Sequence, residues 1–296
     1  MEDIGELLSR GFSVWKKNLN LCLPFLFSII LSMLMLMAFV AAIFMVLMPE
    51  GFDALMFEDS QNATLMQAQM ESILSGLDAA QLTSAALLFL GVMLLISLIN
   101  SFFSAGAIGM ARQALETGRS DTAEMWSSGR KYFRNMFLAT LLIGLITFAG
   151  MVALLPAIAL YPNPLAADAR TAGSLIFGLL LFLLYALAVS VILIAAPYAL
   201  VVENLGPVSA LRAAIRFFRY NKFDVFVMWL VVTALSTGLQ MIGGAAGEGA
   251  AGGQPLSLIA SLANLMVLAP LSGLWWTRLY MNRAGMLKVD EVKDPW

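Results

Sequence analysis

The sequence predicts an all-α polytopic membrane protein, a helical bundle of six transmembrane helices. Composition is the first indication, because 60% of the 296 residues are hydrophobic and only 12% are charged. Soluble globular proteins carry about 25% charged residues. The second indication is the presence of six long apolar stretches, and the third is the placement of Lys and Arg. In lipid, backbone groups must pair within their own segment, so these stretches are expected to be helices.

Each of the six stretches is nearly free of charge and long enough to cross the hydrocarbon, which takes about 20 residues in a helix. They cover residues 22–48, 84–109, 135–161, 173–202, 223–245 and 255–280. The chain is therefore expected to form one transmembrane domain over 1–296, which ends in a short cytoplasmic tail at 286–296.

The basic residues predict the orientation. If the amino terminus is cytoplasmic, all of the 17 Lys and Arg except Arg170 fall in cytoplasmic segments. Cytoplasmic loops carry an excess of Lys and Arg, so this distribution is a strong topological signal. It predicts a multi-pass protein of the cytoplasmic membrane with both termini in the cytoplasm.

Three stretches that precede spans 1, 3 and 5 resemble one another. They cover 4–18, 122–135 and 207–221, and they align an aromatic residue, a basic residue after it and a small residue four places before it. The aligned sets are Gly11, Trp15 and Lys16; Gly129, Phe133 and Arg134; and Ala214, Phe218 and Arg219.

This pattern predicts three repeated helical hairpins, each preceded by an interfacial helix at the cytoplasmic face. The repeat units are about 1–117, 118–204 and 205–285. An alternative explanation is that inner membrane boundaries attract aromatic and basic residues in any protein.

The third of these stretches shows the amphipathic pattern of a helix that lies in the headgroup plane. Val208, Leu211, Ile215 and Phe218 share one predicted face, and three arginines occupy another. Basic residues in such a helix face anionic lipid phosphates. The candidate headgroup contacts are Lys16, Lys17, Arg130, Lys131, Arg134, Arg212, Arg216 and Arg219. The alternative is that they only anchor the topology.

Polar side chains inside the spans are few and uncharged. Asn100, Gln240 and Asn264 are candidate positions along a substrate path, since polar residues within membranes often mark such paths. Interhelical hydrogen bonding is the alternative explanation. Repeats in transporters place sites at their interface, but the three predicted repeats all run in the same direction, unlike two inverted halves.

Residue usage narrows the chemistry further. The chain has no histidine and one cysteine, Cys22, which excludes an intrachain disulfide, a Ser-His-Asp triad and a His-ligated zinc or haem site. We expect no catalytic residues, no metal site and no cofactor. An isoelectric point of about 5.2 argues against nucleic acid as a partner. Glycosylation of the sequon at Asn62 stays open.

One segment, 195–235, resembles a known type of sequence. It combines Pro197 in a returning helix, a Glu-Asn-x-Gly-Pro turn that begins at Glu203, and an aromatic-basic stretch before the next span. The segment resembles a unit of uncharacterised prokaryotic, including archaeal, membrane proteins. These are similar to the membrane domain attached to some glycerophosphoryl diester phosphodiesterases. The resemblance implies fold and lineage. Phosphodiesterase activity does not carry over, because it depends on His and acidic residues in a separate soluble barrel.

These observations together favour a non-enzymatic component of the cytoplasmic membrane that binds lipids or a protein partner. The expected partners are membrane lipids and a second protein or further copies of the chain. A permease or channel-like subunit for a small solute is the alternative.

Overall fold

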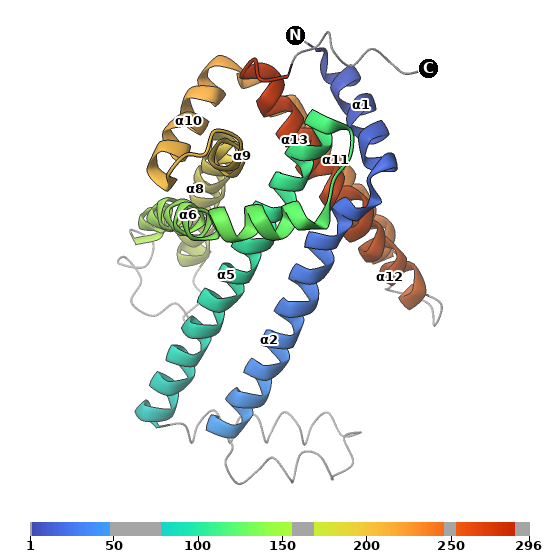
Figure 1. Cartoon of the computed structure of the whole chain (residues 1–296). Helices are drawn as coiled ribbons and strands as arrows, with labels where there is room; N and C mark the ends of the chain where they lie inside the picture. The colour runs from blue at the N-terminus through green and yellow to red at the C-terminus, as the bar shows by residue number, and fades with distance from the viewer. Residues whose placement is uncertain (1, 48–77, 156–168, 246–252, 288–296) are drawn as a thin grey trace. The chain divides into compact units, whose positions relative to one another are not determined.

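The structure is a computed structural model that describes residues 2–47, 78–155, 169–245 and 253–287, and every regular element in these ranges is helical (Figure 1). Within these ranges, six helices are long and apolar enough to cross a membrane, which confirms the six predicted spans. They are Leu19–Ile43, Ala79–Thr117, Thr122–Val152, Ile176–Val202, Lys222–Gly243 and Ser257–Arg283. The sequon at Asn62 lies outside the described residues.

The elements follow one another as short helices and long spans. In the first half they are α1 (Ile4–Lys17), η1 (Leu19–Cys22), α2 (Leu23–Leu47), α5 (Ala79–Thr117), α6 (Thr122–Ala149) and η2 (Gly150–Leu154). In the second half they are α8 (Ala169–Leu193), α9 (Ala196–Val202), α10 (Pro207–Tyr220), α11 (Lys222–Ala245), α12 (Gly253–Ala263), η3 (Asn264–Leu268) and α13 (Ala269–Arg283).

Large apolar side chains are exposed along all six of these helices. Examples, one from each, are Met37, Leu87, Phe148, Phe177, Met241 and Leu258. A water-soluble monomer rarely exposes apolar surface on this scale, because burying it is favourable. The surface is instead suited to contact with lipid chains.

The chain forms two compact units. The second unit, 27–100, contains most of α2 and the first part of α5. Within it, the Ser28 hydroxyl donates a 2.6 Å hydrogen bond to the Asn100 side-chain oxygen, and the Phe39 and Phe89 rings lie 5.9 Å apart. The first unit, 1–26 and 101–296, contains all of the other elements.

Small residues allow the helices of the first unit to approach closely. A Cβ atom added at Gly106 of α5 would lie 2.7 Å from the Met125 carbonyl oxygen of α6. One turn further, Gly109 meets Ser128 of α6. Close packing of this kind drives helix association in a membrane, because the hydrophobic effect does not favour helix–helix contact over helix–lipid contact there.

Turn residues separate consecutive helices. Gly118, at φ +76°, ends the α5 segment in a conformation that favours glycine. The Asp121 carboxylate then accepts a hydrogen bond from the Ala123 amide and caps α6. Asn204 takes a left-handed conformation at φ 56° before Pro207 opens α10.

The three predicted interfacial helices take different forms. α1 and α10 are separate 14-residue helices. The stretch 122–135 is not separate, because it forms the first half of the 28-residue helix α6. The helix continues directly from this stretch into the span.

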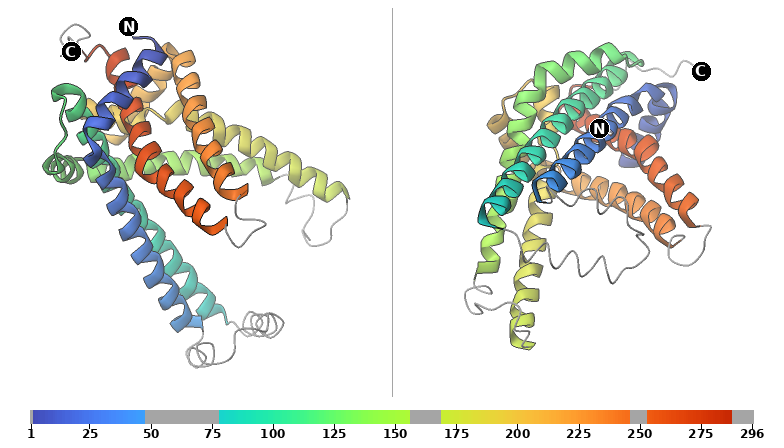
Figure 2. Two further views of the ribbon diagram at one scale, coloured as in Figure 1. Left: turned by 90° about the vertical axis from the view of Figure 1, so that its right-hand side faces the viewer. Right: turned by 90° about the horizontal axis from the view of Figure 1, so that it is seen from below.

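Helix α1 lies along α13, at the two ends of the chain (Figures 1 and 2). Leu7 and Gly11 of α1 are buried. The Trp275 indole of α13 donates a 3.1 Å hydrogen bond to the Leu8 carbonyl oxygen. Gly11 is the point of closest approach, because an added Cβ would lie 2.7 Å from the Trp275 indole nitrogen.

Gly11→Ala is therefore expected to destabilise the packing of α1 on α13, by about 1–3 kcal/mol, the usual cost of overpacking. Thermal unfolding of the detergent-solubilised chain measures the cost, and limited proteolysis near the amino terminus reports the release of α1. Gly5→Ala is the matched control, because its Cβ would meet only the Asp3 carboxylate at 3.5 Å. Equal stability of the two variants would contradict the close contact.

Candidate functional site

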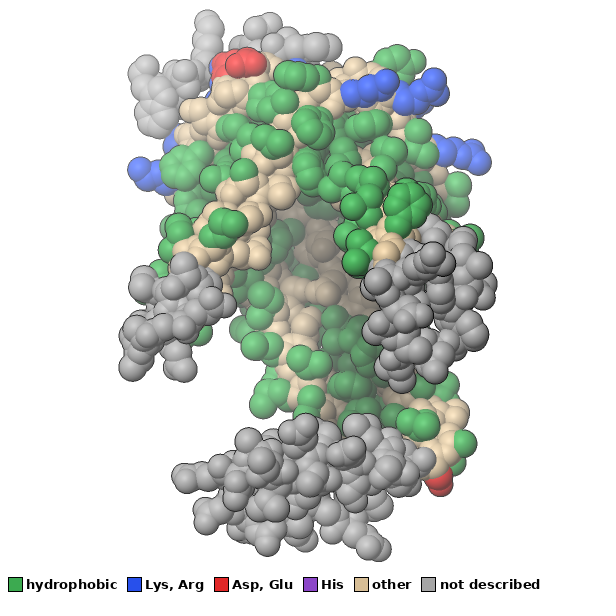
Figure 3. Space-filling view, turned by 180° about the vertical axis from the view of Figure 1, so that it is seen from behind, with side chains coloured by type: hydrophobic (Ala, Val, Ile, Leu, Met, Phe, Trp, Pro, Cys, Tyr) green, Lys and Arg blue, Asp and Glu red, His purple; other side chains and the backbone are tan. Residues whose placement is uncertain are grey.

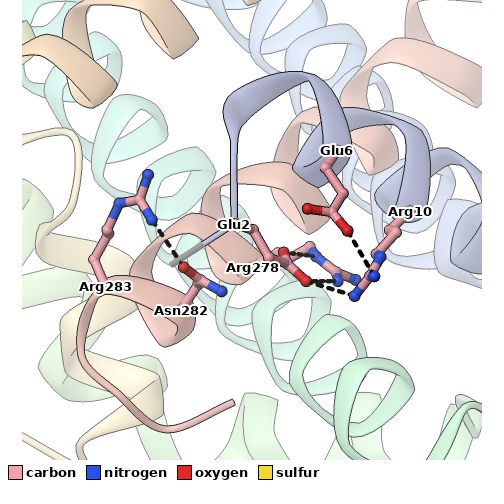
Figure 4. Close-up of polar contacts among 6 residues, drawn as sticks. All are labelled: Glu2, Glu6, Arg10, Arg278, Asn282 and Arg283. Carbon is pink, nitrogen blue, oxygen red and sulfur yellow. Dashed lines mark hydrogen bonds and ion pairs between the residues drawn. The ribbon is translucent and has the colours of Figure 1, made fainter. Parts of the chain in front are cut away.

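A buried cluster of charged residues joins the amino terminus to α13 (Figure 4). The Glu2 carboxylate accepts hydrogen bonds of 3.0 and 2.6 Å from the Arg278 guanidinium and one of 2.9 Å from Arg10. Glu2 is 5% exposed and Arg278 is 9% exposed. Two-pronged pairing of Arg with a carboxylate is the strongest form of this interaction.

Two opposing effects determine the pKa of the Glu2 carboxyl. Burial raises it, because the charged form loses solvation. The hydrogen bond and positive charge of Arg278, together with those of Arg10, outweigh burial, so the pKa of Glu2 lies below its ordinary value. Arg278 and Arg10 thus stabilise the charged carboxylate form of Glu2.

Two further polar contacts connect α13 to neighbouring helices. The Arg283 guanidinium donates a 2.7 Å hydrogen bond to the Asp224 carboxylate of α11. The Tyr280 hydroxyl donates to the Glu203 carboxylate at the end of α9, and the Tyr280 ring packs 4.9 Å from Phe217 of α10. α13 thus contacts α1, α9, α10 and α11 through its last three turns.

Two asparagines join the end of α1 to the turn between α5 and α6. The Asn18 amide donates to the carbonyl oxygens of Val14 and Gly118, and its oxygen accepts from the Ser120 amide. Asn20 exchanges two further hydrogen bonds with Ser120. The start of the first span is therefore fixed to the loop that opens α6.

The predicted lipid-contact residues are exposed on three helices. Lys16 and Lys17 end α1, and the others lie on α6 and α10: Arg130, Lys131, Arg134, Arg212, Arg216 and Arg219. Figure 3 shows Lys and Arg at the margin of a mostly hydrophobic surface. Sequence reasoning therefore identified exposed residues, while it missed the buried pair of Glu2 and Arg278. The only available signal was an acidic residue beside a predicted interfacial helix.

Helix α10 gathers its arginines around one hollow. Arg212, Ile215, Arg216 and Arg219 lie at spacings of three and four on one face, and Tyr220 and Lys222 complete the rim. We call this the basic hollow; its volume is about 550 Å³. Among the described residues, none of its four cations forms an ion pair with a carboxylate.

The residues of the predicted apolar face of α10 differ in burial. Leu211 is buried, but Val208 and Ile215 are 52% and 43% exposed. Alanines and Phe217 form the packed face instead, because small side chains let α10 approach α9 closely. Val208 and Ile215 are left on the outer side of the helix, where they add apolar surface beside the arginines.

A second hollow lies among the spans of the first unit. It has a volume of about 420 Å³, and its lining includes Ser190, Tyr198, Trp229, Thr233, Ser272 and Trp276. We call this the apolar hollow, because aromatic and aliphatic groups dominate its walls. Pro197, where α8 gives way to α9, also lines it.

Two of the three predicted intramembrane polar residues meet in a third hollow of about 230 Å³. Gln240 of α11 and Asn264 of η3 line it together with Ser257 and Ser261. The Gln240 amide donates a 3.2 Å hydrogen bond to the Ser236 hydroxyl. We call the hollow that Gln240 and Asn264 line the amide hollow. Asn100, the third predicted residue, belongs to the second unit, where it pairs with Ser28.

The last span changes its winding beside the amide hollow. Asn264–Leu268 forms a π-helical turn, and Pro270 follows it. Pro270 has no N–H to donate to the Met266 carbonyl four residues earlier. The Cys22 thiol donates a 2.8 Å hydrogen bond to that carbonyl. Cys22 thus has a defined structural role that the sequence did not reveal.

Comparison with known proteins places the chain among sequences without an assigned activity. The model of a family described as "Domain of unknown function (DUF7847)" matches residues 4–269. A relative described as "Uncharacterized protein" from Archaeoglobus fulgidus is 23% identical over 303 residues, which cover 95% of this chain and 96% of the relative. No solved structure matches. The matches give no link to glycerophosphoryl diester phosphodiesterases.

Glu2→Gln is expected to destabilise the chain by about 3 kcal/mol, because it leaves the buried Arg278 charge without its counter-ion. Unfolding in detergent at pH 7 measures this loss. Glu6→Gln is the matched control, since Glu6 pairs with Arg10 on the exposed side of α1, where a pair contributes less than about 1 kcal/mol.

The pH dependence of the free energy of unfolding provides a second measurement of what the Glu2 carboxylate contributes to stability. Because the folded-state pKa of Glu2 is lowered, the stabilisation is complete above the unfolded-state pKa of about 4.3. It is lost as the pH falls through the folded-state pKa. Glu2→Gln removes this part of the acid-induced loss. An unchanged acid profile in that variant would contradict the assignment.

Proposed function

We propose a lipid-binding function for this chain, which belongs to the family described as "Domain of unknown function (DUF7847)". In this proposal the protein is a non-enzymatic, multi-pass component of the cytoplasmic membrane. Its exposed basic residues bind anionic lipids at the cytoplasmic surface, where they also provide a docking surface for a protein partner or a second copy.

The observation that carries the proposal is the outer face of α10. Three exposed arginines form no ion pair within the described residues and lie beside the exposed Val208 and Ile215. Arginines without internal counter-ions are available to phosphate groups, which they bind in a two-pronged manner. Exposed apolar residues next to them suit the boundary between headgroups and acyl chains. A water-exposed helix gains nothing from this combination.

The proposed orientation places both termini in the cytoplasm. It rests on the distribution of Lys and Arg in the sequence, with Arg170 as the exception. The inner leaflet carries anionic lipids in many cells, so the basic helices would meet them on this side. We also propose a shared lineage with the membrane domain of glycerophosphoryl diester phosphodiesterases. This lineage implies a similar topology and no enzymatic activity.

A threefold repeat with units near 1–117, 118–204 and 205–285 is part of the same proposal. Its support comes from matched positions. The small residues Gly11, Gly129 and Ala214 are all buried. Asn18 and Asn221 both end a 14-residue helix, and each side chain donates to the carbonyl oxygen four residues earlier. The second copy differs, because its amphipathic half continues into α6.

The full chain in detergent is expected to be stabilised more by added phosphatidylglycerol than by phosphatidylcholine of the same acyl chains. Ligands that bind only the folded state raise its stability. The triple variant Arg212→Gln, Arg216→Gln, Arg219→Gln should lose most of the difference, and salt should reduce it in the wild type. Arg119→Gln is a control on an exposed arginine in the turn between α5 and α6. Equal stabilisation of the wild type by both lipids would refute the proposal.

A permease-like role is the second candidate function, and the amide hollow is the observation that favours it. Gln240 and Asn264 lie in one intramembrane hollow beside a π-helical turn, a feature that is frequent at functional sites. The hollow carries amide and hydroxyl groups without charge. Its chemistry suits a small neutral solute with hydrogen-bonding groups.

Flux of small polyols and amides into proteoliposomes tests this role. Gln240→Leu is expected to abolish flux through the amide hollow, because the site would then lose a hydrogen-bonding amide. Gln81→Leu, at the start of α5, removes a glutamine outside the set that lines the hollow and is the matched control. Flux that is the same in wild-type and protein-free vesicles for every solute would exclude the permease role.

A further inference from the structure

We propose that the basic hollow and the apolar hollow together form one binding site for a single anionic phospholipid. The phosphate group would bind in the basic hollow, and an acyl or isoprenoid chain would lie along α11 into the apolar hollow. This inference rests on the proposed lipid-binding function and adds to it a defined position and stoichiometry.

Helix α11 contributes a wall to each hollow. Lys222 lines the basic hollow, and Trp229 and Thr233 line the apolar hollow. Lys222, Phe226, Trp229 and Thr233 follow one another at spacings of four and three, so they share one side of the helix. Seven residues separate Lys222 from Trp229, a distance of about 10 Å along the axis. The two hollows therefore follow one another along the same helix face.

Helix α13 contributes a second wall along the same path. Ser272 and Trp276 line the apolar hollow, and Tyr280 lies one turn further on. Tyr280 packs on Phe217 of α10, the residue that follows Arg216 of the basic hollow in the sequence. The ion pair between Arg283 and Asp224 holds the ends of α13 and α11 together. Both helices thus lead from the arginines into the span region.

The chemistry changes along this path as a phospholipid would require. The basic hollow presents four cations without an ion pair among the described residues. Beyond it, the half-exposed Phe226 ring stacks on Trp229, with ring centroids 6.1 Å apart. The apolar hollow then offers about 420 Å³, within the range of small-molecule sites. A free phosphate would use only the first part of this path.

The charge arrangement favours lipid over an acidic protein segment. Ile215, exposed at 43%, stands among the arginines, and the path continues into a helix that is apolar enough to span a membrane. Polar peptide backbone is excluded from such surroundings, because its groups would go unpaired. An anionic amphiphile satisfies both ends of the path.

The test titrates the full chain in detergent with dioleoyl phosphatidylglycerol and counts bound lipids by native mass spectrometry. One lipid per chain should bind before any others. Dioleoyl phosphatidylcholine and glycerol 3-phosphate should each bind at least about tenfold more weakly, since charge-assisted hydrogen bonds and apolar burial are both needed.

Variants separate the two parts of the site. Arg212→Gln with Arg219→Gln should weaken phosphatidylglycerol binding by about tenfold or more. Val232→Trp, which fills the apolar hollow, should weaken it while leaving the weak binding of glycerol 3-phosphate unchanged. Arg119→Gln removes an exposed positive charge in the turn between α5 and α6, outside the basic hollow, and should change affinity by less than about threefold. Unliganded melting temperatures verify that each variant is folded.

Several outcomes would overturn the site. Glycerol 3-phosphate that displaces the lipid at equal concentration would show a soluble-anion site. Equal weakening by Arg119→Gln would show general charge attraction, which leaves the proposed lipid-binding function intact but removes the defined position. If the wild type showed no preference for phosphatidylglycerol, both the defined position and the proposed lipid-binding function would be refuted.

Discussion

The arrangement of the first unit depends on polar contacts made by the last turns of α13. Arg278 binds Glu2 before α1, Tyr280 binds Glu203 after α9, and Arg283 binds Asp224 of α11. Each contact joins α13 to a segment that is distant in sequence. Dispersion alone holds apolar helices together weakly in lipid, because lipid chains are as apolar as leucine. Ionic and hydrogen-bonded contacts at one end of the helices therefore select a single arrangement.

The same contacts explain why α1 is part of the bundle although it is amphipathic. Its pairing with α13 combines a buried ion pair with a close fit at Gly11. Removing two charges from water is costly, and the geometry compensates only when hydrogen bonds are complete. Here three bonds reach the Glu2 carboxylate. The pair thus specifies the position of α1 and leaves Lys16 and Lys17 exposed at the start of the first span.

Hydropathy was sufficient to predict all six spans, because crossing a membrane imposes a minimum apolar length on each. The same reasoning found the exposed arginines of α10, whose spacing marks one face. It could not find the pair of Glu2 and Arg278, since 276 positions separate them and only the packed helices bring them together. It also could not distinguish the buried Leu211 from the exposed Val208 and Ile215 on the same predicted face. An apolar residue at helical spacing indicates a face, but whether protein or lipid covers that face depends on the neighbouring helices.

Proline in the returning helices links the sequence pattern to the hollows. Pro197 cannot donate to the Leu193 carbonyl, and both residues line the apolar hollow. Pro270 cannot donate to the Met266 carbonyl, and there the Cys22 thiol supplies a hydrogen bond. Interrupted helices are tolerated at membrane depth only where protein or a cavity accommodates the freed backbone groups. At Pro270 a side chain from η1 meets this requirement, and the helix packs closely. At Pro197 the interruption turns α8 into α9 and borders open space. The two prolines therefore have different outcomes, and the break at Pro197 borders the volume in which the proposed lipid chain would lie.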